Sequence, residues 1–170
     1  MNANQITVNA YDLDNTLYKG NSHKDLVLKH LSLQLNSNIL NEKIESIFKF
    51  FLLLVLPKFY RLIGRKFYAY RFYNFILSGL NKQYLIDLSE LIAEDFSGKF
   101  DKELINKYLS PDFYDTNHDS YLVTSAPDFI ANSFSKKLGL ANFISSESKL
   151  DNSEKFEFEF ITSIRGEKLQ

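Results

Sequence analysis

The chain has 170 residues, 45% of them apolar, which suits one domain or one core with a modest insertion. It contains no cysteine, so disulfides, thiolate metal sites and a cysteine nucleophile are excluded, and a reducing cytoplasm is favoured. The net charge is −1, and the polar first residues have no basic and apolar leader pattern, so no signal peptide is predicted.

The first elements predicted along the chain are one strand and a long block of helices. Residues 6–13 form a β-rich run that ends in acidic residues. Apolar residues at helical spacing then predict helices over 25–35, from an N-cap at Asn41 to a break or kink at Pro57, and over 65–78, 82–96 and 101–109. Gly79 follows the third of these helices, in a position typical of a C-terminal cap.

The pattern changes to alternating strands and helices after residue 119. Short apolar segments predict strands at 120–124 and 142–145, with a helix from Pro127 to Leu138 between them. Residues 155–164 alternate apolar and charged side chains, which indicates a two-faced strand or hairpin arm, and 166–170 resemble the start of a helix. The layout predicts an α/β core with a helical insertion after its first strand.

The middle of the insertion is apolar, basic and rich in aromatic residues. Between Ser46 and Ile86 there is no Asp or Glu, whereas seven Lys and Arg occur there, which indicates an anionic partner. Its most apolar run, 47–56, has about half of the roughly 20 residues that a membrane span needs. Two interpretations stay open for this run, a buried helix and a helix that lies at a membrane interface.

Two carboxylates, Asp12 and Asp14, stand two residues apart where the first strand ends. In a strand their side chains point the same way, and like charges this close favour a cation between them. Hard oxygen ligands suit Mg²⁺, and this end of a strand is where open α/β sheets bind ligands. The alternative is a capped turn, because Asp, Asn and Thr are common turn residues.

Asp12-Leu13-Asp14-Asn15-Thr16 matches the first motif, D-x-D-x-T, of the haloacid dehalogenase (HAD) phosphatases. The resemblance implies a Rossmann-like parallel core over 1–19 and 111–170, with an inserted all-helical cap over 20–110. It implies that Asp12 is the nucleophile and forms an aspartyl-phosphate, and that Asp14 is the general acid and base. Asp12 and the Asp14 carbonyl would bind Mg²⁺, and Thr16 would hold the loop and contact substrate. Asn15 departs from the usual Gly, but Asn tolerates left-handed conformations.

Two further segments fit the resemblance. In Tyr121–Pro127 the hydroxyl of Thr124, with Ser125 as the alternative, would donate to a phosphoryl oxygen. Backbone N–H groups near Ser125 and Ala126 would add to this contact, although a hydroxyl before a helix is also an ordinary cap. Near the end, Gly166-Glu167-Lys168 resembles the third motif and makes Lys168 the expected catalytic cation, with a solvated surface lysine as the alternative.

The fourth motif of the family, a later strand with further acidic residues, is missing before Gln170. One metal-binding carboxylate and one core strand are therefore not accounted for, so the parallel sheet is expected to be incomplete at the C-terminal side. This leaves a truncated or degenerate module, which binds phosphate or membrane without turnover, as an alternative to an active phosphatase.

The character of the cap resembles that of bacterial HAD-type phosphatidylglycerophosphatases. This resemblance implies a phospholipid headgroup as substrate, with Arg61 and Arg65 among the residues that bind it. A small soluble phosphomonoester such as phosphoserine is the alternative. The expected location is cytoplasmic, with peripheral contact on the inner membrane face through the basic aromatic cap. Nucleic acid is not expected, because the aromatic residues are predicted on helices rather than on strands or loops.

Overall fold

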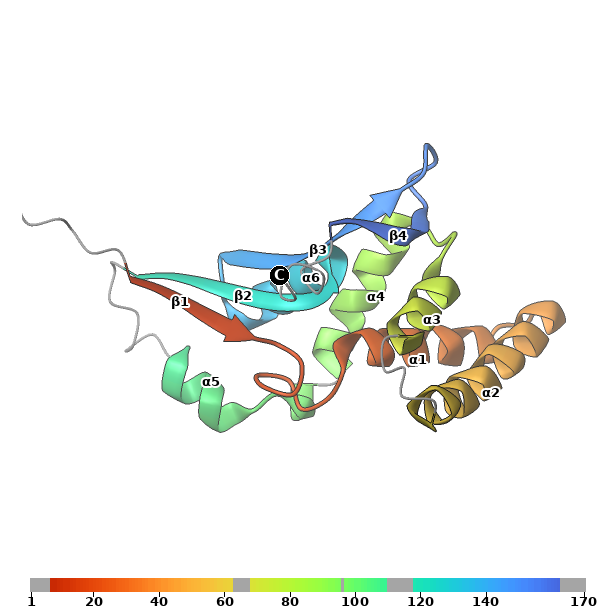
Figure 1. The fold of residues 1–170 in the computed structure, drawn as a ribbon, viewed down its shortest axis with the longest axis horizontal. Helices are drawn as coiled ribbons and strands as arrows, with labels where there is room; N and C mark the ends of the chain where they lie inside the picture. Colours follow the sequence, from red (N-terminus) through yellow and green to blue (C-terminus); the bar gives the residue numbers. More distant parts are fainter. Residues whose placement is uncertain (1–6, 63–67, 96, 110–117, 163–170) are drawn as a thin grey trace, which may run out of the picture.

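A computed structural model describes residues 7–62, 68–95, 97–109 and 118–162 (Figure 1). Its sheet has four strands in the order β1-β2-β3-β4. The strands are β1 (Thr7–Asp12), β2 (His118–Pro127), β3 (Asn142–Leu150) and β4 (Phe156–Thr162). The helices are α1 (Ser22–Leu35), α2 (Leu40–Leu62), α3 (Tyr68–Leu77), α4 (Lys82–Asp95), α5 (Lys102–Tyr108) and α6 (Asp128–Leu138), with a short 3₁₀ helix, η1 (Ser97–Lys99). The predicted α/β class is confirmed.

The sheet is mixed, whereas a parallel sheet was predicted. Strands β1, β2 and β3 run parallel, and β4 returns antiparallel to β3. The tight turn between them is built on Asp151, whose carboxylate accepts from the N–H groups of Ser153 (2.7 Å) and Lys155 (2.9 Å). Glu154 completes the reversal with a left-handed φ of 57°. The described part of the alternating segment, Phe156–Thr162, is therefore a hairpin arm, one of the two options predicted for 155–164.

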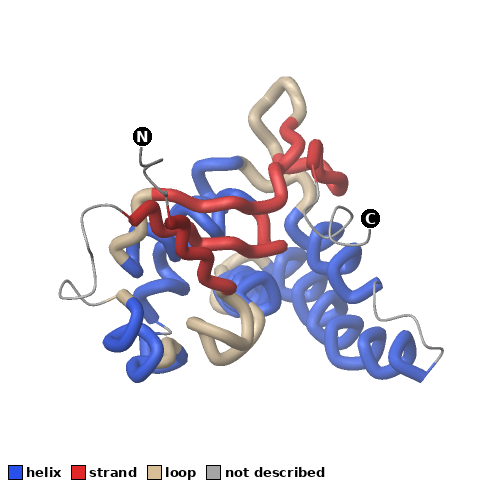
Figure 2. Tube along the Cα trace, turned by 60° about the vertical axis from the view of Figure 1, so that its left-hand side comes forward, coloured by secondary structure: helices blue, strands red, loops and turns tan. Residues whose placement is uncertain are grey.

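Helices α1 to α4 lie together at one end of the sheet, and α5 lies apart from them beneath β1 (Figure 1). In a second view helices lie at the lower right and at the lower left of the strands (Figure 2). Helices α1 to α5 come between β1 and β2 in the sequence, as the helical insertion was predicted to do. The division into core and cap at residues 20 and 110 stays a prediction. No helix within the described residues has the length and apolarity that crossing a membrane requires.

The N-cap predicted for α2 is wrong, and of the break or kink predicted at Pro57 the break is wrong. The helix already includes Leu40, so Asn41 is not its N-cap, and it continues through Pro57 to Leu62. A proline removes one backbone donor, but most helical stability in proteins comes from packing of a face rather than from local preference. Here α2 packs along α1, with Leu53 buried and the hydroxyl of Ser46 donating to Gln34 at 2.6 Å.

An aromatic cluster joins the loop after β1 to the rest of the core. The ring of Tyr18 meets Phe134 of α6 edge to face at a centroid distance of 5.2 Å, and Phe100 at 5.7 Å. Tyr18 and Phe134 are completely buried. Edge-to-face pairs add to the stabilisation from burial, so this cluster anchors the loop that follows β1.

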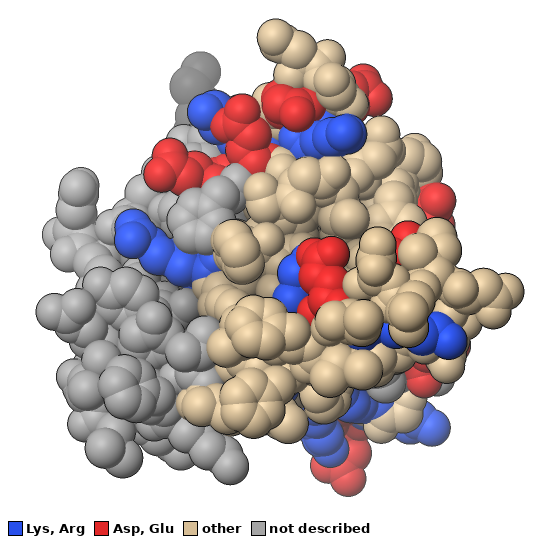
Figure 3. Space-filling model, turned by 90° about the vertical axis from the view of Figure 1, so that its right-hand side faces the viewer, with Lys and Arg blue, Asp and Glu red and all other residues tan. Residues whose placement is uncertain are grey.

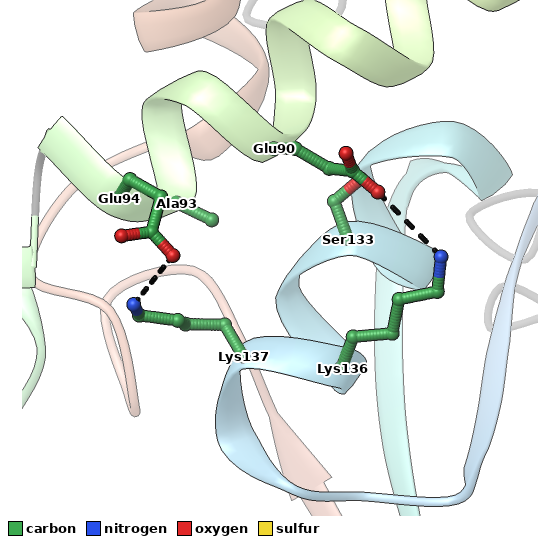
Figure 4. Close-up of a pocket in the computed structure, with 6 residues that line it drawn as sticks. All are labelled: Glu90, Ala93, Glu94, Ser133, Lys136 and Lys137. Atoms are coloured by element: carbon green, nitrogen blue, oxygen red, sulfur yellow. Dashed lines mark hydrogen bonds and ion pairs between the residues drawn. The ribbon is translucent and has the colours of Figure 1, made fainter.

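The groove between α4 and α6 encloses about 360 Å³ and carries two ion pairs (Figure 4). Lys137 binds Glu94 at 2.7 Å and Lys136 binds Glu90 at 3.5 Å. Each lysine faces a carboxylate of the opposite helix, so the pairs align α4 on α6. All four side chains are at least one third exposed, and such exposed pairs contribute little to stability.

Replacing Phe134 by Ala is expected to lower the free energy of unfolding by about 3–5 kcal/mol, because it leaves a cavity at the aromatic cluster. The exposed ion pair between Lys137 and Glu94 provides the control variant. Lys137→Ala is expected to change stability by less than about 1 kcal/mol. Urea unfolding of both variants measures the difference, and equal losses would contradict the assignment of the core.

Candidate functional site

The loop after β1 turns sharply because one residue adopts a left-handed conformation. Asn15 has a φ of 63°, and its N–H donates to the carbonyls of Tyr18 (2.8 Å) and Gly20 (3.1 Å). Asn reaches this region more readily than most residues, so it replaces the Gly expected here. The turn leaves Asp12 at the end of the strand and Asp14 inside the loop.

Asp12 is exposed at the carboxyl end of β1. The hydroxyl of Thr16 donates to its Oδ2 at 3.0 Å, so one carboxylate oxygen is oriented by the loop itself. Exposure and orientation are both required of a carboxylate that attacks a substrate.

Asp14 is half-buried and lies against the start of α1. Its Oδ1 accepts from the backbone N–H of Ser22 at 2.7 Å. Burial raises the pKa of Asp14 above its ordinary value, and the negative charges of Asp12 and Asp25 add to this, whereas the bond from Ser22 acts against it. The two carboxyl groups therefore differ in their surroundings: Asp12 is exposed, whereas Asp14 is half-buried in surroundings that favour its protonated form.

A buried cluster below this loop was not predicted from the sequence. Asp25 is only 7% exposed, and its Oδ2 accepts from the hydroxyl of Tyr18 at 2.6 Å and from Nζ of Lys99 at 2.7 Å. Burial and the adjacent Asp25 carboxylate raise the pKa of Tyr18, which stays protonated as the donor. Asp25 alone indicated a helix start, and Lys99 is 74 residues away, so local patterns do not indicate this pairing.

The segment before α1 and the segment before α5 run side by side at the site. The N–H of Lys19 donates to the carbonyl of Lys99 at 2.7 Å, and the N–H of Asp101 donates to Leu17 at 2.9 Å. Lys19 and Asp101 also form an ion pair at 3.1 Å. Residues 17–19 and 99–101 therefore form a short antiparallel pair, the strap, which holds these two segments together beside the loop that carries Asp14.

Thr124 lies at the same edge of the sheet as Asp12, because the β1–β2 register pairs Asp12 with Val123. It is 1% exposed, and its Oγ1 accepts from the N–H of Ala126 at 3.1 Å. The N–H of Ala126, predicted to contact substrate, is thus bonded to Thr124 in this structure. Ser125 is partly exposed, and its carbonyl accepts from the hydroxyl of Ser146 at 3.1 Å.

The predicted basic residues lie outside the described part of the structure. This holds for Arg65, Lys168 and the side chain of Arg61. From the described part of the insertion, Tyr70 of α3 reaches the site, where its hydroxyl accepts from Nδ2 of Asn21 at 2.8 Å. His23 packs against the ring of Tyr70 at 5.9 Å. Neither contact was predicted from sequence.

The described residues of the site supply some, but not all, of the ligands that a metal ion needs. Among the described residues there is no group of three or more His, Asp or Glu side chains that could hold a metal ion. The carboxylate of Asp12 and the backbone carbonyl of Asp14 are hard oxygen donors of the kind that Mg²⁺ prefers. Mg²⁺ commonly keeps several water molecules and is held by one or two carboxylates and substrate phosphates, so these residues fit part of its shell.

Comparisons with known proteins relate this architecture to solved structures. Neither a protein-family model nor a curated protein matches the chain. A protein of unknown function from Bordetella pertussis Tohama I is similar over 92% of this chain and 67% of its own, with 12% identity and a TM-score of 0.66. A HAD family hydrolase from Salmonella enterica serovar Typhi is similar over 93% and 46%, with 11% identity and a TM-score of 0.59.

A probable phosphoserine phosphatase from Vibrio cholerae is similar over 94% of this chain and 42% of its own, with 10% identity and a TM-score of 0.52. The chain spans less than half the length of this structure and of the Salmonella hydrolase. The chain therefore shares the fold of the solved HAD family hydrolase and of the probable phosphoserine phosphatase. The comparisons offer no support for the resemblance to phosphatidylglycerophosphatases.

The Tyr18→Phe variant tests the buried cluster. It removes one of the two donors to Asp25, so the free energy of unfolding is expected to fall by about 1–3 kcal/mol. Tyr11→Phe is the control, because the Tyr11 hydroxyl bonds to the carbonyl of Tyr108 at an exposed position. That change is expected to be below about 1 kcal/mol. Denaturant unfolding measures both, and a similar small effect in each would argue against a structural role for Asp25.

The Asp14→Asn variant tests the raised pKa of that carboxyl. A pKa above the ordinary value of 3.8 means that the folded protein binds the proton more tightly, so the stabilisation is lost as pH rises through the folded pKa. The amide carries no charge. The variant should therefore gain stability over the parent as pH rises from below 3.8 towards neutrality, in thermal unfolding with EDTA. A difference in stability that does not change with pH would contradict the raised pKa.

Proposed function

We propose that the chain carries the catalytic carboxylates of a phosphomonoester hydrolase that works through an aspartyl-phosphate. The observation that carries this proposal is the contrast between two neighbouring carboxyl groups. Asp12 is exposed and oriented by Thr16, whereas Asp14 is half-buried with a raised pKa. A nucleophile beside a proton donor is what this displacement needs. The HAD fold supports the proposal.

In the first step an Asp12 oxygen bonds to phosphorus and the ester P–O bond breaks. Asp14 gives its proton to the leaving oxygen, so the product departs as an alcohol. In the second step Asp14 takes a proton from water, the water oxygen bonds to phosphorus, and the Asp12–phosphate bond breaks. Inorganic phosphate leaves, Asp12 is again a carboxylate and Asp14 is again protonated.

Thr124, Ser125 and Lys168 remain proposed phosphate-binding residues. The Thr124 hydroxyl accepts from Ala126 in this structure, so its own proton is available to donate to a phosphoryl oxygen. Asp12 and the Asp14 carbonyl would hold Mg²⁺, which when bound neutralises negative charge on the phosphoryl group. The proposal also keeps residues 1–19 and 111–170 as the core and 20–110 as the cap.

For the substrate, we propose a phosphorylated molecule, with a phospholipid headgroup preferred to a small soluble ester. The observation that favours lipid is the exposed apolar side of α2, in the insertion that also supplies Tyr70 to the site. Arg61 and Arg65 stay candidates for headgroup binding on sequence grounds. Phosphoserine and similar soluble esters are the alternative substrates.

The Asp12→Asn variant tests the proposed chemistry. An amide cannot form the acyl phosphate, so Mg²⁺-dependent phosphate release from an aryl phosphate is expected to fall at least about 1,000-fold, a loss comparable to removing a covalent nucleophile. Release is measured for both proteins with Mg²⁺ and with EDTA. Lys102→Gln, an exposed change on α5, is the control and should match the parent.

Equal release by the parent and Asp12→Asn would overturn the role of Asp12. A folded parent that releases no phosphate from an aryl phosphate or from phosphatidylglycerophosphate would favour the binding module without turnover. Faster release from the lipid than from phosphoserine would support the lipid substrate.

A further inference from the structure

One side of α2 is apolar and exposed along its described length. Its residues recur at helical spacing and are each between 43% and 69% exposed. We call this set the α2 outer face: Leu40, Ile44, Ile47, Phe48, Phe51, Leu54 and Val55. From Ile47 to Val55 every exposed side chain of the helix is apolar.

The opposite side of α2 already has a partner. Leu53 is buried, Phe50 packs against the core, and Ser46 bonds to Gln34 of α1. The helix therefore has two apolar sides, and the intramolecular core uses one of them. Proteins rarely expose a continuous apolar surface of this kind unless it contacts a partner or a membrane.

Helix α3, which packs on α2, also carries an exposed apolar side chain. Phe75 is 57% exposed there, and Arg71, one helical turn before it, is also exposed. Uncharged side chains predominate on the described surface at this end of the molecule (Figure 3). An apolar surface with basic residues close by matches the boundary between acyl chains and anionic headgroups.

Charge favours a bilayer over a second copy of the chain. The outer face lies largely within the acid-free stretch from Ser46 to Ile86, which contains seven Lys and Arg. Among the described residues of this stretch, Arg71 is exposed on α3, whereas Lys49 is paired with Glu45 at 2.5 Å. An anionic lipid surface attracts exposed basic residues, at about 1 kcal/mol for each, whereas a second copy would bring the same excess of positive charge.

We propose that the α2 outer face docks on an anionic phospholipid bilayer, with the helix lying in the plane of the interface. From Leu40 to Val55 the face is roughly 22 Å long, at 1.5 Å per residue. The contact needs no phosphoryl transfer. It would hold the insertion at the lipid surface, and the bond between Asn21 and Tyr70 links α3 of that insertion to the proposed catalytic loop.

Co-sedimentation with vesicles tests the proposal, using phosphatidylcholine vesicles with and without phosphatidylglycerol. The parent should bind the anionic vesicles. The double variant Phe48→Ser with Phe51→Ser should bind them at least about tenfold more weakly, because two exposed rings no longer enter the interface. Leu91→Ser on α4, also an exposed apolar position, is the matched control and should bind like the parent.

The Arg71→Gln variant measures the contribution of positive charge to vesicle binding, apart from that of the apolar residues. Binding to anionic vesicles should fall about fivefold, which corresponds to about 1 kcal/mol for one basic residue. Lys102→Gln on α5 should leave binding unchanged. Circular dichroism of every variant checks that the helices are retained, as expected for exposed positions.

The result that overturns the proposal is failure of the parent to bind anionic vesicles, or equal binding by the Phe48/Phe51 double variant. Binding as tight to neutral vesicles would overturn the anionic requirement. A dimer in sedimentation equilibrium that the double variant dissociates, without vesicle binding, would assign the face to a second copy. Asp12→Asn should bind vesicles like the parent, so failure of the catalytic proposal is recognised separately.

Discussion

The buried carboxylate of Asp25 is the constraint on which the candidate site depends. A carboxyl group this far from water requires partners, and Tyr18, before α1, and Lys99, after α4, supply them. Satisfying Asp25 thus brings residues 18 and 99 together. The backbone hydrogen bond between Lys19 and Lys99 then holds these two segments together and supports the loop that carries Asp14.

The same burial gives two identical side chains different properties. Asp12 follows the strand into solvent, whereas Asp14 turns under the start of α1 and keeps its proton to higher pH. Neither property belongs to the D-x-D pattern alone. Both come from the left-handed turn at Asn15 and from the N–H of Ser22, which hold the second carboxyl group inside the loop.

Two surfaces of the described structure are available to a partner: the edge of the sheet at β1 and the α2 outer face. Strand β1 lies at the edge of the sheet with β2 as its only described neighbour, and the chain spans less than half the length of two of its structural relatives. The α2 outer face is the other open surface. The edge offers backbone hydrogen bonds, whereas the helix face offers apolar area beside basic residues, so they suit different partners.

The sequence by itself determined the class of the fold, the order of its elements and the loop with Asp12, Asp14 and Thr16, because these follow from local patterns. Tertiary structure decided what depends on distant residues. It paired Asp25 with Lys99, bonded Ala126 to Thr124, carried α2 through Pro57 and turned β4 antiparallel. It also decided which apolar side of α2 is buried, because periodicity marks an apolar side but not what covers it.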